Sequence, residues 1–125
     1  MLVISYNPGY QTVLKDLKPS TKQRFIALNF DFPQEEVERK ILVREVPGTK
    51  PEIAQKLVAI GRKARLLKDH GLEESTSTRA LVYAASMMAA GLDPVTACQV
   101  AMVNPITDDP ELADALMEIV QAHFS

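Results

Sequence analysis

The sequence predicts a mostly α-helical protein, in which a bundle of four helices follows an incomplete α/β segment with two strands. From Pro51 onward, apolar residues recur at helical spacing, and proline or glycine separates the periodic runs. Before residue 33, two short runs rich in β-branched and aromatic residues are typical of strands. The break Val46-Pro47-Gly48-Thr49-Lys50-Pro51 divides these regions, so we expect one domain over residues 1–46 and another over residues 47–125.

Length and composition indicate an ordinary globular protein of 125 residues, 46% hydrophobic and 24% charged. A net charge of −2 argues against broad electrostatic binding of nucleic acid or of an anionic membrane. The single cysteine, Cys98, excludes an intrachain disulfide, and two distant histidines lack ligand spacing, so we expect no metal site. No apolar run reaches about 18 residues and no signal peptide is evident, so we expect a cytoplasmic protein without a membrane span.

The first segment contains two expected strands and a helix. Leu2–Tyr6 is the first strand, and Asn7-Pro8-Gly9 then turns the chain. Phe25–Phe32 is the second strand, followed by a helix over residues 34–46 whose apolar stripe contains Val37, Ile41 and Leu42. Two strands cannot form a stable sheet alone, so this segment is not expected to fold independently.

Four helices are expected in the second segment, and their ends carry clear signals. An aspartate followed by proline provides an N-cap and a rigid first helical residue, and glycine stops a helix. The helices begin at about Pro51, Ser75–Ser77, Asp93-Pro94 and Asp109-Pro110, and the first two stop at Gly71 and Gly91. Four basic residues of the first of these helices are interpreted as a solvated face, with a surface that serves a partner as the alternative: Arg62, Lys63, Arg65 and Lys68.

Arg79 is the first candidate functional residue. It is the only charge in Thr78–Gly91, a helix that is otherwise apolar almost all round and is therefore expected at the centre of the bundle. The helix dipole disfavours a cation in this first turn by about 0.3–1 kcal/mol. Its position indicates an anionic partner, either a carboxylate of Glu73 or Glu74 or a phosphate that the guanidinium binds bidentately.

Arg24 and Asn7 are the other two candidates. Arg24 directly precedes the second expected strand; it either caps helix carbonyls or faces solvent, or it reaches a neighbouring subunit's nucleotide as an arginine finger. Asn7 ends the first expected strand, where it suits the Asn-Pro-Gly turn and also a ligand crevice at the edge of a sheet. No phosphate-binding loop of the form G-x-x-x-x-G-K-[ST] occurs in the chain.

Five segments, taken in order, resemble the C-terminal half of the CbbQ/NirQ/NorQ proteins, a branch of the MoxR group of AAA+ ATPases. The resemblance covers essentially the whole chain, and the ordered combination is more specific than any single motif. The segments are Ile4-Ser-Tyr-Asn-Pro-Gly-Tyr-Gln11, Leu17-Lys-Pro-Ser-Thr-Lys-Gln-Arg-Phe25, Asp69-His-Gly-Leu-Glu-Glu-Ser-Thr-Ser-Thr-Arg79, Ala90-Gly-Leu-Asp-Pro94 and Pro105-Ile-Thr-Asp-Asp-Pro110.

The resemblance implies a role for each candidate residue. Asn7 matches the sensor 1 residue, which orients the attacking water near the γ-phosphate, and Arg24 matches the arginine finger that acts in trans. Arg79 matches sensor 2, the arginine of the helical lid that contacts the nucleotide phosphates. Residues 47–125 then form an AAA+ lid-type bundle, and residues 1–46 the end of the α/β core.

The resemblance also implies a function for the intact protein. It would be a ring-forming, hexameric ATPase that uses ATP and Mg²⁺ to remodel a metalloenzyme, in Rubisco activation or nitric oxide reductase maturation, with a von Willebrand factor A-type partner. The chain has no Walker A or Walker B motif, so alone it is expected to bind no cofactor and to hydrolyse no ATP. Two alternatives remain open: a free-standing helical interaction module, and a truncated regulatory subunit that donates Arg24 to rings.

Overall fold

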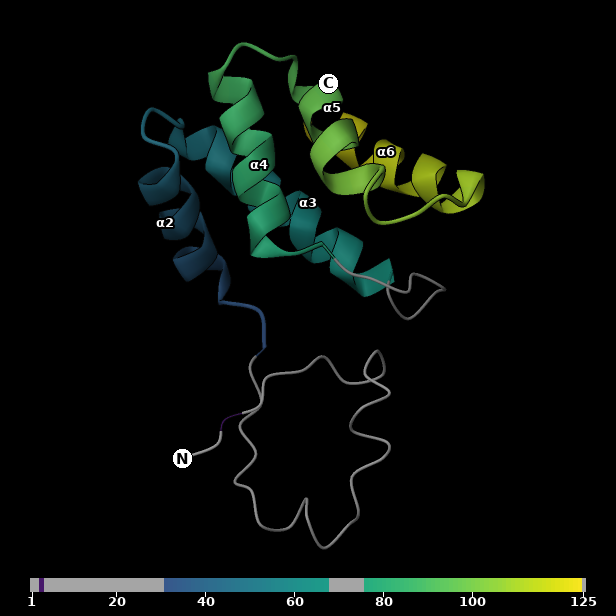
Figure 1. Ribbon diagram of the computed structural model, residues 1–125, viewed down its shortest axis with the longest axis horizontal. Coiled ribbons are helices and arrows are strands. Elements are labelled where there is room, and N and C mark those ends of the chain that lie inside the picture. The colour runs from purple at the N-terminus through teal and green to yellow at the C-terminus, as the bar shows by residue number, and fades with distance from the viewer. Residues whose placement is uncertain (1–2, 4–30, 68–75, 125) are drawn as a thin grey trace, which may run out of the picture. The chain divides into compact units, whose positions relative to one another are not determined.

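A computed structural model describes residue 3 and residues 31–67 and 76–124 of the chain. The chain divides into two compact units, residues 1–31 and residues 32–125, and we call the second the helical unit. Figure 1 shows that its described residues are helices joined by short connections. The two expected strands lie outside the described residues except at residues 3, 31 and 32, which have no regular secondary structure.

The described residues form five α-helices and no strand, which confirms a mostly helical chain but not the expected bundle of four. The fifth member is the helix expected over residues 34–46, because its Leu42 and Val46 lie in the same hydrophobic core as the other helices. The helices are α2 (Glu35–Glu45), α3 (Pro51–Leu66), α4 (Thr78–Ala89), α5 (Pro94–Cys98) and α6 (Pro110–Phe124), and a π-helical turn η2 (Gln99–Val103) continues α5.

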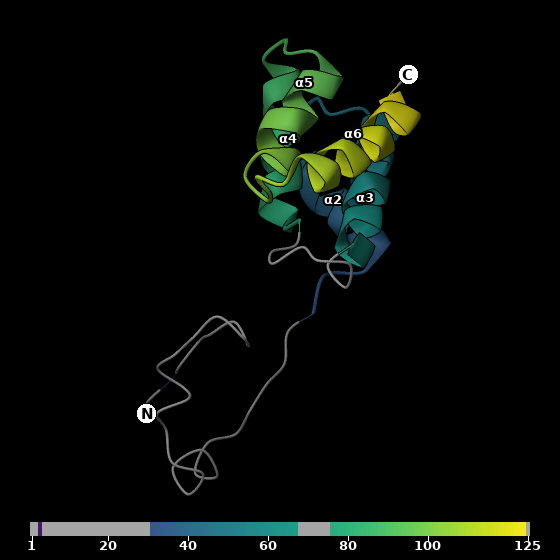
Figure 2. The same cartoon turned by 90° about the vertical axis from the view of Figure 1, so that its right-hand side faces the viewer.

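Helices α3 and α4 form the middle of the helical unit. Helix α2 packs against both of them, while α5, η2 and α6 cover the other side (Figures 1 and 2). Leu57 and Ile60 of α3, Leu81 of α4 and Met102 of η2 are each at most 2% exposed and fill the space between the layers. The helical recurrence of apolar residues after Pro51 therefore corresponds, in α3, to side chains that enter the core.

The N-terminal signals of α4, α5 and α6 are confirmed by their hydrogen bonds. Ser77 Oγ accepts from the Ala80 amide at 3.2 Å, and Asp93 Oδ2 accepts from the Thr96 amide at 3.2 Å. Asp109 Oδ1 accepts from the Glu111 amide at 2.9 Å. Each side chain satisfies an amide that the first helical turn leaves without a partner, so these helix starts are local properties of the sequence.

The buried face of α2 differs from the expected one. Val37 is 47% exposed, whereas Glu38 is fully buried and lies in line with Leu42 and Val46, at intervals of four residues. The face is centred on residues 38, 42 and 46 because α2 contacts α3 and α4 together. The charged side chain of Glu38 thus lies on the buried face of α2, where an apolar residue is expected. Its hydrogen-bond partners belong to the candidate functional site.

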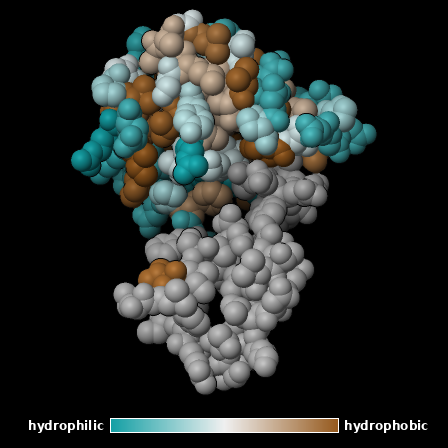
Figure 3. Space-filling view, viewed as in Figure 1, coloured by the Kyte–Doolittle hydropathy of each residue, from teal (hydrophilic) through white to brown (hydrophobic). Residues whose placement is uncertain are grey.

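The visible face of the helical unit mixes hydrophilic and hydrophobic side chains (Figure 3). A groove of about 580 Å³ runs between α2 and α3, lined by Glu36, Arg39, Lys40, Val43, Arg44, Pro51, Glu52, Ala54 and Gln55.

Within the described residues, no helix is long and apolar enough to cross a membrane.

Candidate functional site

Arg79 lies in the first turn of α4, directly after the cap residue Ser77 and the first helical residue Thr78. Its side chain is exposed, in contrast to the buried Leu81 that follows two positions later. The guanidinium carries a full positive charge, and the dipole of α4 adds a partial positive charge at this end of the helix. This arrangement can bind an anion such as a phosphate. The alternative carboxylate partners, Glu73 and Glu74, lie outside the described residues.

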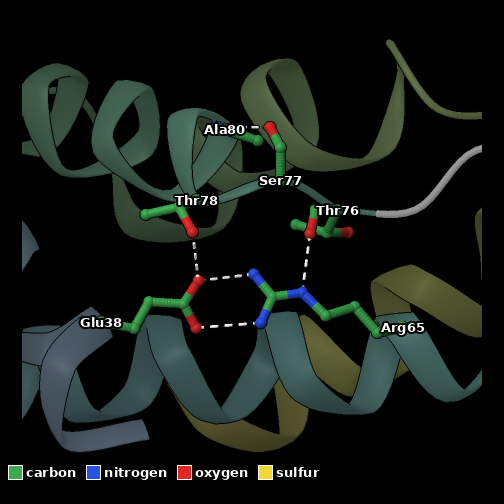
Figure 4. Close-up of polar contacts among 6 residues, drawn as sticks. All are labelled: Glu38, Arg65, Thr76, Ser77, Thr78 and Ala80. Atoms are coloured by element: carbon green, nitrogen blue, oxygen red, sulfur yellow. Dashed lines mark hydrogen bonds and ion pairs between the residues drawn. The ribbon is translucent and has the colours of Figure 1, made fainter. Parts of the chain in front are cut away.

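A buried ion pair lies beside this turn (Figure 4). The Arg65 guanidinium of α3 donates to both oxygens of the Glu38 carboxylate of α2, with Nη1–Oε1 at 2.9 Å and Nη2–Oε2 at 2.5 Å. The Glu38 side chain is fully buried and that of Arg65 is 10% exposed. This fork-to-fork geometry is the strongest form of a carboxylate–arginine contact, and it makes the mutual orientation of α2 and α3 specific.

The same two side chains hold the start of α4. Thr78 Oγ1 donates to Glu38 Oε2 at 2.6 Å, and Arg65 Nε donates to the backbone carbonyl of Thr76 at 2.8 Å. Each of the three guanidinium nitrogens of Arg65 therefore donates a hydrogen bond, two to Glu38 and one to Thr76. The two residues held, 76 and 78, flank the cap of α4, and residue 78 immediately precedes Arg79.

One aromatic ring completes the surroundings of Arg65. Its guanidinium carbon lies 3.9 Å from the centre of the Phe32 ring, within the range of a cation–π contact. Phe32 is the first residue of the helical unit. We call Phe32, Glu38, Arg65, Thr76 and Thr78 the Arg65 cluster. It joins the entry into the helical unit, α2, α3 and the first residue of α4.

Comparison with known proteins now identifies the family. Residues 38–123 match the family model described as CbbQ/NirQ/NorQ C-terminal. The chain belongs to the CbbQ/NirQ/NorQ family.

Curated family members agree with this assignment over almost the whole chain. The chain is 53% identical over 125 residues to the denitrification regulatory protein NirQ of Pseudomonas aeruginosa and 52% identical over 124 residues to the protein CbbQ of Hydrogenophilus thermoluteolus. It is 48% identical over 124 residues to the protein NorQ of Paracoccus denitrificans. These matches take in 99–100% of this chain but only 46–48% of each relative, so the chain spans about half of their length.

Membership of the CbbQ/NirQ/NorQ family confirms the resemblance drawn from the sequence but tests none of the three residue roles. Asn7 and Arg24 lie outside the described residues. Arg79 is described, and its exposed place in the first turn of α4 is compatible with a phosphate partner. Among the described residues, no three histidine, cysteine, aspartate or glutamate side chains gather as a metal site.

The interpretation of Arg65 as part of a solvated basic face is wrong, because its side chain is only 10% exposed and is paired with Glu38. Glu38 was not among the candidate functional residues predicted from the sequence. A signal existed for both residues. Glu38 is four residues before Leu42, and Arg65 is four residues after Gly61 and seven after Val58, all of them buried. A charged residue that continues an apolar row on a helix indicates a buried charge, and a buried charge needs a partner of opposite sign.

Proposed function

We propose that the chain is the C-terminal part of an ATP-driven, ring-forming protein of the MoxR group, in which the helical unit acts as the AAA+ lid and Arg79 contacts the nucleotide phosphates. One observation carries the proposal. In a chain of this family, an exposed arginine occupies the first turn of a central helix, where the helix dipole disfavours a cation that has no anionic partner.

The residues present suit a nucleotide phosphate at this position. The guanidinium of Arg79 offers two parallel donors, and the N-terminal end of the α4 dipole adds positive potential. When bound, ATP with Mg²⁺ supplies the phosphoanhydride that is hydrolysed. Arg79 neutralises phosphate charge, Asn7 orients the attacking water, and Arg24 completes the site of the neighbouring subunit.

The target and partners are proposed from the names of relatives and from the family resemblance. The relatives are named as denitrification regulatory protein NirQ, protein CbbQ and protein NorQ. We propose that the intact protein forms a cytoplasmic hexamer. It remodels or matures a metalloenzyme together with a von Willebrand factor A-type partner. Rubisco and nitric oxide reductase are the two candidate targets.

The experiment uses an intact chimera, in which this chain replaces the matching half of the Pseudomonas aeruginosa NirQ, to which it is 53% identical. Magnesium-dependent ATP turnover and the affinity for ATP are measured for the chimera and for Arg79→Ala. Loss of a charged hydrogen-bond pair is worth about 1.5–3 kcal/mol, so we expect ATP affinity to fall about 10-fold or more.

Two further variants make the result specific. Arg62→Ala is the matched control, because it removes an exposed arginine of α3 whose nearest carboxylate among the described residues, Glu35, is 4.0 Å away. It should leave ATP affinity unchanged. Arg79→Lys should restore only part of the affinity, since an ammonium lacks the paired donors. Equal ATP affinity and turnover in Arg79→Ala and in the parent chimera would instead favour a helical interaction module without a nucleotide role.

A further inference from the structure

The Arg65 cluster offers a function beyond the contacts that fold the bundle. We propose that Glu38, Arg65 and Thr78 are positioning residues for Arg79: they fix the first turn of α4 against α2 and α3, and thereby set where the guanidinium of Arg79 meets a nucleotide phosphate. This inference rests on the proposed nucleotide role of Arg79, and the experiment below separates the two.

The first support is the number of directional hydrogen bonds that meet at the pair. Glu38 Oε1 accepts one bond from Arg65, and Oε2 accepts from both Arg65 and Thr78. The third guanidinium nitrogen of Arg65, Nε, donates to the Thr76 carbonyl. Because every one of these bonds is directional, the cluster fixes the rotation of the first turn of α4 as well as its distance from α2.

The second support is the burial of the pair. Removing two charges from water costs several kcal/mol per ion, and an apolar pair of similar volume often stabilises a fold equally well. Glu38 is fully buried and the side chain of Arg65 is 10% exposed, so this penalty applies here. If the only role of these positions were to hold the helices together, apolar side chains would be sufficient, as at Leu42 one turn further along α2.

The third support is the place of the cluster in the chain. Thr78 is bonded to Glu38 and the next residue, Arg79, is exposed, so the cluster and the proposed phosphate-binding side chain are on consecutive residues. Phe32, the first residue of the helical unit, stacks on the same guanidinium. The cluster therefore links the entry into the helical unit to the helix that carries Arg79.

The test uses Thr78→Val in the intact chimera, because valine keeps the volume of threonine and removes only the hydroxyl that donates to Glu38. Coupling energies of this kind correspond to about 5- to 150-fold in affinity. We expect ATP affinity to fall at least about fivefold, and Thr78→Ser, which keeps the hydroxyl, to restore most of it. The kcat at saturating ATP should change less than KM.

A merely structural role predicts a different pattern. Val120→Ala removes two methyl groups from a side chain of α6 that is 1% exposed, so it lowers the melting temperature without touching the cluster. If Thr78→Val acts only through stability, Val120→Ala should change the KM for ATP to the same extent at the same loss of melting temperature. That outcome would overturn the proposal.

The double variant Thr78→Val/Arg79→Ala decides whether Thr78 acts through Arg79. If it does, the double variant binds ATP no more weakly than Arg79→Ala alone. Two outcomes would refute the positioning role and leave the proposed function intact. In the first, the losses of ATP affinity in the two single variants add up in the double variant. In the second, Arg79→Ala clearly lowers ATP affinity but Thr78→Val does not. No loss in Arg79→Ala would refute the proposed function itself.

Discussion

Removing the Glu38 carboxylate should be among the most damaging single changes on the helical unit. Glu38→Ala leaves the Arg65 guanidinium, 10% exposed, without its two carboxylate bonds, and leaves the Thr78 hydroxyl without its acceptor. Breaking a buried ion pair by removing one partner costs about 3–5 kcal/mol. Since the whole free energy of unfolding of a small domain is about 5–15 kcal/mol, this loss should be a large part of it.

The neighbouring pair on the same two helices provides a matched control. Glu35 lies one turn before Glu38 on α2, and Arg62 lies three residues before Arg65 on α3; their closest approach is 4.0 Å, with side chains 48% and 50% exposed. Exposed pairs of this kind contribute about 0–1 kcal/mol. Glu35→Ala therefore removes the same atoms from the same helix, and should cost about 1 kcal/mol or less.

The assay is urea unfolding of the full chain at 25 °C and pH 7, followed by far-ultraviolet circular dichroism. The loss is obtained from the shift in midpoint, provided that the slope with urea stays the same. We expect Glu38→Ala to lose at least about 2 kcal/mol more than Glu35→Ala. Equal losses in the two variants would refute the claim that burial makes the Glu38–Arg65 pair different.

Three further predictions concern the stability of the helical unit. Thr78→Val should cost about 1.5–3 kcal/mol in urea unfolding because it removes a hydrogen bond to a charged group, whereas Thr76→Val should cost less than about 0.5 kcal/mol, since the Thr76 hydroxyl has no partner among the described residues. Burial raises the pKa of the Cys98 thiol from 9.0 to about 12. The unfolded chain therefore loses this proton first, and stability should fall by up to about 1.4 kcal/mol per pH unit from pH 9 toward 12. Urea unfolding across this range should show a smaller fall in Cys98→Ala, and an equal fall in both proteins would contradict the assignment. In Gly61→Ala, the new Cβ would lie 3.1 and 3.2 Å from the two δ carbons of the fully buried Leu81, so crowding should outweigh the gain in helix propensity. A net loss of about 1 kcal/mol is expected in urea unfolding, and a more stable variant would show that Leu81 can move aside.

The parts of the fold that the sequence predicts well are those determined by neighbouring residues. The caps Ser77 and Asp93 bond to amides three residues away, and Asp109 to one two residues away. Gly91 has a φ of 102°, the left-handed region that favours glycine, which explains why α4 ends just before it. Such interactions are present in the sequence as short motifs, so the starts of three helices could be placed before the structure was known.

The cluster beside Arg79 was harder to predict because its members are far apart in the sequence. The residues of the ion pair, Glu38 and Arg65, are separated by 27 positions, and Glu38 and Thr78 by 40. A helical pattern shows which face a charge occupies, but not which charge of another helix meets it. The expected bundle of four left out α2 for the same reason, since the pattern of α2 does not say that its Leu42 enters the core of α3 and α4.

A variant that replaces the ion pair by apolar residues would separate cohesion from positioning. In Glu38→Leu/Arg65→Met, no charge of this pair remains buried. The Thr78 hydroxyl and the Thr76 carbonyl lose their partners, and the Phe32 ring loses its contact with the guanidinium. Its stability should therefore lie within about 2 kcal/mol of the parent and well above that of Glu38→Ala.

Apolar contacts carry little directional preference, so the first turn of α4 should then be less firmly oriented although the bundle is well folded. In the intact chimera we expect this double variant to melt near the parent and yet to bind ATP at least about fivefold more weakly. If it binds ATP as the parent does, the directional bonds of Arg65 and Glu38 are not what places Arg79, and the cluster serves the fold alone.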